Sequence, residues 1–222
     1  MTNEKKHNRI SKISGVKMLI LLMFMLAPVW ATAQDAGANH HHGGHHGKKP
    51  LVHTFEDTEK YAAKFERAER DDYQKPDEVI KALAIQPGQI IADVGAGSGY
   101  FTRRLAQAVG PAGAVYAIDI EPGMLALVRK DAETRQLSNV IPILASVDSP
   151  KLPPGKVDMI FISDTVHHIP NRVGYFAELK AHLSPDSRVV ISDFKKMESP
   201  VGPPLAHKLS EEEIEAELTK AG

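Results

Sequence analysis

From residue 54 onward, segments of helical character alternate with short apolar runs, and this alternation most constrains the fold. The runs are five to seven residues long and cover 89–94, 114–118, 140–144, 157–163 and 188–192. Such uniformly apolar runs are typical of strands buried on both faces. Strands joined through helices run parallel with right-handed crossovers. The pattern therefore predicts an α/β fold with a doubly wound, mostly parallel Rossmann-like sheet and helices on both faces.

The segments between these runs predict helices at 54–72, 76–84, 99–109, 122–135, 171–183 and 210–222. Ser210 to Glu213 has the pattern of a capping box, and residues 184–186 (SPD) predict a turn before the last strand. The sequence therefore predicts one domain over 54–222, with 188–192 as its last strand.

The first 33 residues have the three-part plan of a secretory signal peptide. Five Lys or Arg and one Glu precede a 13-residue uncharged run, Met18–Trp30. The small residues at 31–33 (ATA) predict cleavage before Gln34. At about 1.5 Å per residue, such a helix is shorter than the ~30 Å core of a bilayer. We expect an exported bacterial protein, periplasmic or secreted, without a stable membrane partner after cleavage. A membrane anchor formed by an uncleaved signal is the alternative.

Residues 34–53 are expected to form a flexible linker, because 35–50 are rich in His, Gly and Lys and almost free of apolar side chains. Neutral imidazoles at this density can form a weak site for Zn, Ni or Cu ions, or the segment is a solvated linker with incidental metal affinity. The histidines are His40, His41, His42, His45 and His46.

The composition of the chain excludes several functions for residues 34–222, which follow the expected signal peptide. The chain has no Cys, so disulfides, thiolate metal sites and Cys nucleophiles are excluded. Residues 34–222 carry a net charge of −5, which argues against a nucleic-acid partner. No metal site is expected in the core.

A glycine loop follows the first expected strand. It runs from Asp93 to Gly99 (DVGAGSG) and opens a helix, where free N–H groups favour an anionic ligand group. The missing Cβ atoms of its glycines allow close approach of a ligand. Asp119 ends the second strand, where a carboxylate can accept two hydrogen bonds from a ribose diol. Together these features predict a nucleoside-containing ligand.

The identity of the nucleoside depends on two details of the loop. The dinucleotide fingerprint ends in Gly or Ala where this chain has Tyr100. Asp93 would repel a pyrophosphate and suits a cation. The sequence contains no P-loop string. These details favour S-adenosylmethionine, which carries a sulfonium and an ammonium group; a nicotinamide oxidoreductase is the alternative in another class.

The glycine loop and 116–125 (YAIDIEPGML) resemble the class I S-adenosylmethionine-dependent methyltransferases, over about residues 73–222. The stretch 74–76 (QKP) also resembles an exported methyltransferase-like subgroup. The sheet of the family usually has two further strands after the last helix, so the resemblance implies a domain that lacks its C-terminal β-hairpin, with 189–191 on an unpaired edge. The resemblance implies that the loop lines the methionine part of the cofactor, that Asp119 holds its ribose and that residues after Asp119 lie beside its adenine. The residues implied to bind the cofactor are Gln74, Asp93, Gly95, Ala96, Gly97, Gly99, Asp119, Ile120, Met124 and Asp148.

The fourth strand ends in 163–170 (SDTVHHIP), which resembles the type 11 methyltransferases of small molecules. Asp164, His167 and His168 are candidates to take a proton from an acceptor. Alternatively, the His pair caps a helix or packs beneath the cofactor. We expect S-adenosylmethionine-dependent methyl transfer to a small-molecule acceptor. A catalytically degenerate nucleoside-binding module in the cell envelope is the alternative.

Overall fold

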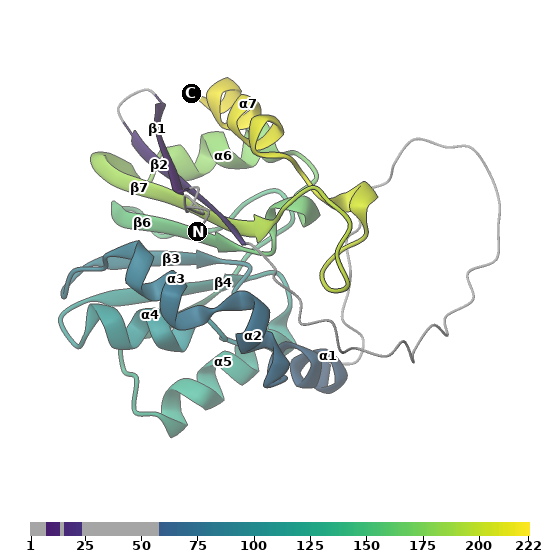
Figure 1. Cartoon of the computed structure of the whole chain (residues 1–222). Coiled ribbons are helices and arrows are strands. Elements are labelled where there is room, and N and C mark those ends of the chain that lie inside the picture. The colour runs from purple at the N-terminus through teal and green to yellow at the C-terminus, as the bar shows by residue number, and fades with distance from the viewer. Residues whose placement is uncertain (1–7, 14–15, 24–57) are drawn as a thin grey trace, which may run out of the picture.

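The computed structural model describes residues 8–13, 16–23 and 58–222, and its centre is a seven-stranded sheet (Figure 1). The strand order is β1-β2-β7-β6-β3-β4-β5. Every neighbouring pair from β2 to β5 is parallel, and only β1 with β2 is antiparallel. The strands are β1 Asn8–Ile13, β2 Val16–Met23, β3 Ile90–Val94, β4 Ala114–Asp119, β5 Val140–Leu144, β6 Val157–Ser163 and β7 Leu183–Phe194. This arrangement confirms the predicted Rossmann-like sheet.

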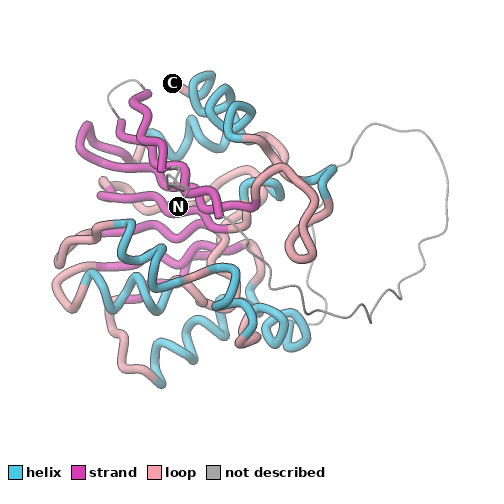
Figure 2. The backbone as a smooth tube through the Cα atoms, in the orientation of Figure 1, coloured by secondary structure: helices cyan, strands magenta, loops and turns pink. Residues whose placement is uncertain are grey.

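Helices lie on both sides of the strands, as Figure 2 shows. The α-helices are α1 Thr58–Phe65, α2 Glu69–Gln74, α3 Pro76–Leu83, α4 Thr102–Val109, α5 Pro122–Thr134, α6 Arg172–Lys180 and α7 Glu211–Ala221. Two short 3₁₀ turns cover Val166–His168 and Leu205–His207. Pro76 starts α3, and Ser210 with Glu213 forms the predicted capping box of α7.

Alternate residues of each central strand pack into two separate apolar clusters. Ile91, Met159 and Phe161 contact the buried faces of α3 and α4. Ala92 and Ile160, on the opposite side of the same strands, contact α6 and α7. Burial of both faces explains why the strand sequences are continuously apolar. It also leaves the ends of the strands as the place where polar groups gather.

The edge of β7 differs from the sequence prediction. Residues 189–191 are not on an unpaired edge, because β2 runs parallel beside them, with Met18 opposite Val189 and Ile20 opposite Ile191. No strand follows β7 within 58–222, so the hairpin that completes the sheet comes from the N-terminal segment. The backbone groups at this edge thereby gain hydrogen-bond partners, which an open strand edge lacks.

Two local predictions were also wrong. The helix expected over 54–72 is divided into α1, which ends at Phe65, and α2, which begins at Glu69. At the break, the guanidinium of Arg70 donates to the Phe65 carbonyl at 2.8 Å. The turn expected at 184–186 lies inside β7, where the register against β6 shifts. There the hydroxyl of Ser187 donates to the Val157 carbonyl at 2.6 Å and accepts from the amide of Ser184, so the extra residues form a bulge.

The expected cleavage site and the His-rich linker, residues 34–53, lie outside the described residues. Of the expected signal peptide over 1–33, only 8–13 and 16–23 are described. Within the described ranges, none of the helices combines the length and the apolar character that a membrane span needs.

Candidate functional site

The glycine loop connects β3 to α4 and is held against the end of β4. The amides of Gly95 and Ala96 donate to the carbonyl of Ile118, at 2.8 and 3.0 Å. The amide of Gly97 donates to Oδ2 of Asp119 at 2.8 Å. Gly95 and Gly97 have φ values of +77° and +53°, which favour glycine. The predicted loop and the predicted strand-end carboxylate therefore lie together.

Asp119 is oriented by backbone groups on both sides. Its Oδ1 accepts from the amide of Glu121 at 2.9 Å, while Oδ2 accepts from the loop. Burial raises the pKa of Asp119, and these two N–H donors act against that rise. Ile120 next to it is 37% exposed, an unusual position for a large apolar side chain, whereas Met124 is fully buried. Asp119 and Ile120 thus offer a polar and an apolar contact side by side.

Asp93 lies fully inside the protein at the end of β3. Its Oδ2 accepts a hydrogen bond of 2.6 Å from the hydroxyl of Thr102. Burial raises the pKa of Asp93 to about 7, and the negative charge of Asp119 adds to the rise, against the effects of Thr102 and Arg70. A cation bound near Asp93 would favour its charged form. The electrostatics here suit a positively charged ligand group.

Residues 58–74 cover the glycine loop. The ring of Phe65 lies 3.6 Å from where a Cβ atom on Gly97 would be, and Ser98 donates to the carboxylate of Glu66 at 2.5 Å. Gln74, at the end of α2, is completely buried, and neither its amide nitrogen nor its amide oxygen has a hydrogen-bond partner among the described residues. A buried amide without partners costs about 1–3 kcal/mol, so Gln74 has capacity for a polar ligand.

A cluster of acidic and imidazole groups lies at the ends of β6 and β7. Nδ1 of His167 is 3.5 Å from Oδ2 of Asp193, and these two side chains are only 6% and 8% exposed. Asp164 has a φ of +51°, and its Oδ1 is buried without a partner in the described structure. The ring of His168 is centred 4.1 Å from that of His167. The predicted candidates Asp164, His167 and His168 are therefore brought together.

The charges of this cluster influence one another. Burial raises the pKa of Asp164 to about 7; the negative charge of Asp193 adds to the rise, and His167 and Arg70 oppose it. Burial alone would lower the pKa of His167, but the contact with Asp193 and its charge outweigh burial and raise it. The cluster is therefore a buried site with more acidic than basic groups.

The cluster lies next to the glycine loop. A Cβ atom on Gly95 would overlap the side chain of Thr165, so these two residues are in close contact. Thr165 is held in place by a hydrogen bond from its hydroxyl to the Ser163 carbonyl at 2.8 Å. Since Thr165 follows Asp164 directly, the carboxylate cluster and the loop form one continuous site at the carboxyl ends of the strands.

Sequence reasoning missed two residues of this site. Asp193 was overlooked, although it stands near the end of a strand, as Asp93 and Asp119 do. Arg70 lies within the helix expected over 54–72 and was not singled out; its guanidinium carbon lies 3.9 Å from the centre of the Tyr100 ring. Asp148, in contrast, is exposed on the turn closed by Ser146 and Ser149, and none of the described contacts joins it to the loop or to Asp119.

A family model described as a methyltransferase domain, Methyltransf_31, matches residues 85–221. A solved structure of an S-adenosylmethionine-dependent methyltransferase from Aquifex aeolicus superposes with a TM-score of 0.69 at 31% identity. The superposition covers 73% of this chain and 87% of that one.

Curated relatives match a shorter part of the chain. Aklanonic acid methyltransferase DauC from Streptomyces sp. (strain C5) is 31% identical over 105 residues, 47% of this chain and 48% of the relative. Demethylmenaquinone methyltransferase from Geobacillus sp. (strain WCH70) is 29% identical over 114 residues, 51% of this chain and 49% of the relative. The chain thus spans about half the length of these relatives.

Proposed function

This chain belongs to the class I S-adenosylmethionine-dependent methyltransferases, with S-adenosylmethionine as its cofactor, and from that premise we propose that it methylates a small-molecule acceptor. The observation that carries the proposal is the pairing of the glycine loop with Asp119 at the carboxyl ends of β3 and β4. The acceptors named for two relatives, aklanonic acid and demethylmenaquinone, are small molecules, which supports the same class here. No described feature favours the degenerate nucleoside-binding module.

The polar groups of the site fit the two ends of the cofactor. Asp119 accepts from the ribose hydroxyls, and Ile120 provides the apolar contact for the adenine. Asp93 balances positive charge at the methionine end, next to Gly95 and Gly97. The unpartnered amide of Gln74 binds the amino-acid part, where both a donor and an acceptor are useful. Met124 and Asp148 contribute less, because one is buried and the other lies on an exposed turn.

The acceptor binds at the ends of β6 and β7, next to the loop, because ligands of open α/β sheets lie outside the carboxyl ends of the strands. The bound cofactor supplies a methyl group already activated by its sulfonium. The chain therefore contributes mainly by alignment, which can supply several kcal/mol. Asp164, His167 and His168, together with Asp193, orient the acceptor and hold or receive its proton. The negative charge of the body agrees with a small molecule rather than a nucleic acid.

We further propose that this domain acts outside the cytoplasm. The basic N-terminal segment, its uncharged run and 31–33 (ATA) support a signal peptide over 1–33, followed by a linker over 34–53. Sequencing the N-terminus of the exported protein tests this proposal. A mature chain that begins at Gln34 would support it, and one that begins near Met1 would indicate a membrane anchor.

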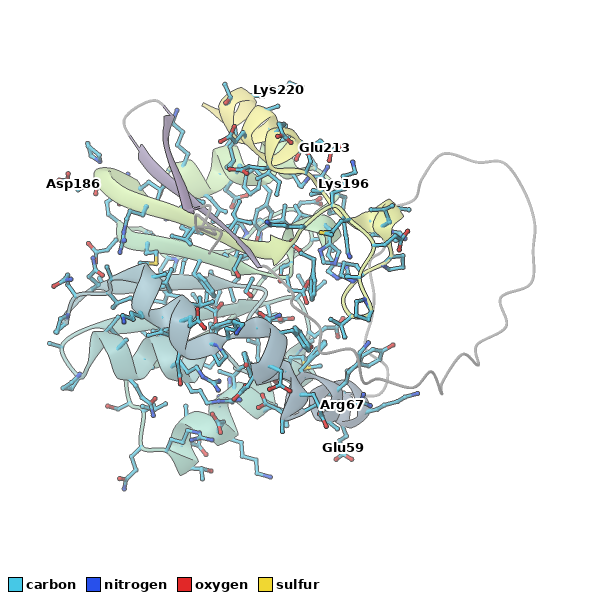
Figure 3. The ribbon with its side chains drawn as sticks, in the orientation of Figure 1. Glu59, Arg67, Asp186, Lys196, Glu213 and Lys220 are labelled. Atoms are coloured by element: carbon cyan, nitrogen blue, oxygen red, sulfur yellow. The ribbon has the colours of Figure 1, made fainter. Side chains whose placement is uncertain are left out.

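Replacing Asp119 with Ala is expected to weaken S-adenosylmethionine binding roughly ten- to a hundredfold, because a charge-assisted double hydrogen bond contributes about 1.5–3 kcal/mol. Calorimetry with the full chain measures the change. Asp186→Ala is the control, since Asp186 is exposed at the opposite end of β7 from Lys196, as Figure 3 shows. An unchanged affinity in Asp119→Ala would remove Asp119 from the site and with it the proposed cofactor geometry.

A further inference from the structure

Three side chains at the ends of β6 and β7 present a set of metal-binding atoms. Asp164, His167 and Asp193 each offer one ligand atom, and these atoms lie within 4.8 Å of one another. They come from two neighbouring strands and the 3₁₀ turn between them, so the parallel pairing of β6 with β7 sets their separation. The grouping therefore arises from the fold and does not depend on a flexible surface loop.

The hydrogen bonding of the three groups is incomplete without a further partner. Oδ1 of Asp164 is buried and has no partner among the described residues. Oδ1 of Asp193 accepts from the Phe194 amide at 2.7 Å, which leaves Oδ2 directed at His167 over 3.5 Å, the outer limit of a hydrogen bond. Buried polar groups are normally satisfied, so these three groups have unused capacity for a further partner between them.

The net charge of the cluster has the same implication. Two carboxylates face a single imidazole, and the permanent cations that act on Asp164 from other elements are Arg70 of α2 and, more weakly, Lys64 of α1. Arg70 is itself engaged with the Phe65 carbonyl and the Tyr100 ring. A buried excess of negative charge is costly unless it is paired or coordinates a metal.

We propose that Asp164, His167 and Asp193 bind a divalent metal ion at the acceptor end of the site. Two carboxylate oxygens and one imidazole nitrogen suit Zn²⁺ or Mn²⁺, and three protein ligands leave at least one coordination position open. The next step rests on the proposed function: the open coordination position takes an oxygen of the methyl acceptor. Coordination lowers the pKa of an acceptor hydroxyl. Its proton passes to His168, the member of the cluster that is not a ligand, and the oxygen remains as the nucleophile for the methyl group.

The linker histidines require a background variant for the test. His40, His41, His42, His45 and His46 are changed to Ser in the full chain, which removes the other expected metal site. Zn²⁺ and Mn²⁺ chlorides are then titrated by calorimetry into this background and into variants that add Asp164→Asn, Asp193→Asn or His167→Gln. Asp186→Asn, exposed at the far end of β7, is the matched control (Figure 3). S-adenosylhomocysteine binding is measured in every variant.

The background and the Asp186→Asn control are expected to bind Zn²⁺ with equal, saturable affinity, more tightly than Mn²⁺. Each of the three ligand variants should weaken Zn²⁺ binding by at least tenfold while S-adenosylhomocysteine still binds. Absence of Zn²⁺ binding in the background, or unchanged affinity in all three variants, would overturn the metal site. Loss of S-adenosylhomocysteine binding in the background itself would instead contradict the proposed function, so the two failures are distinguishable.

Discussion

A Gly95→Ala variant is expected to melt roughly 4–20 °C below the unmodified chain and to lose most of its affinity for S-adenosylmethionine. Two costs add at this position. Its φ of +77° strains any residue with a Cβ atom, by about 1–2 kcal/mol. The new methyl group would also overlap the side chain of Thr165, which adds about 1–3 kcal/mol. For a chain of this size, each kcal/mol shifts the melting temperature by roughly 2–4 °C.

Gly88→Ala separates the two costs. Gly88 has a φ of +89°, but nothing lies within 4 Å of the position of an added Cβ atom. This control therefore carries the backbone strain alone, is distant from the site and should retain cofactor affinity. Adding Thr165→Ala to Gly95→Ala should recover part of the lost stability, because it removes the Oγ1 and Cγ2 atoms that overlap. Equal melting temperatures and affinities for Gly95→Ala and Gly88→Ala would contradict the close contact of the loop with β6.

Removing residues 1–33 is expected to lower the melting temperature by roughly 4–8 °C. The deletion removes β2, which pairs with β7 over seven consecutive residues, together with β1. The free energy of unfolding should fall by at least about 2 kcal/mol if only a few of the lost backbone hydrogen bonds contribute about 0.5–1.5 kcal/mol each. Thermal melts of residues 1–222 and 34–222, with and without S-adenosylhomocysteine, measure the effect.

A deletion of 40–46 is the control for this experiment, because it shortens the chain without removing either strand. Its melting temperature should match that of the full chain. If residues 34–222 melt at the same temperature with the same shift by S-adenosylhomocysteine, the N-terminal hairpin contributes nothing to the domain. If they melt lower, the N-terminal hairpin stabilises the domain, and the proposed signal cleavage would leave the edge of β7 open in the mature chain.

The sequence was sufficient for the parallel sheet because its strands are buried on both faces and are separated by clear helix starts. The division between α1 and α2 could not be predicted, since no Gly or Pro marks it and Arg70 reaches back to the Phe65 carbonyl only in the folded chain. The bulge in β7 was mistaken for a turn because Pro185 and Asp186 are typical turn residues. Here tertiary pairing with β6 overrode the local preference.

The strands at the N-terminal edge of the sheet could not be predicted from the sequence for a different reason. The apolar run of the N-terminal segment has the same composition whether it is a signal peptide or a strand, and periodicity alone cannot separate these roles. Only its pairing with β7 reveals the second one. The proximity of the glycine loop to Asp119 was predictable, because Asp93 and Asp119 lie at the ends of consecutive parallel strands. Asp193 and Arg70 were missed because nothing local shows that they approach Asp164.

Calorimetry of the full chain with S-adenosylmethionine, S-adenosylhomocysteine and NAD shows whether the glycine loop and Asp119 form an S-adenosylmethionine site. We expect saturable binding of both S-adenosyl compounds and none of NAD, because Asp93 favours a cation over a pyrophosphate. Binding of NAD, or the absence of binding by either S-adenosyl compound, would contradict this assignment.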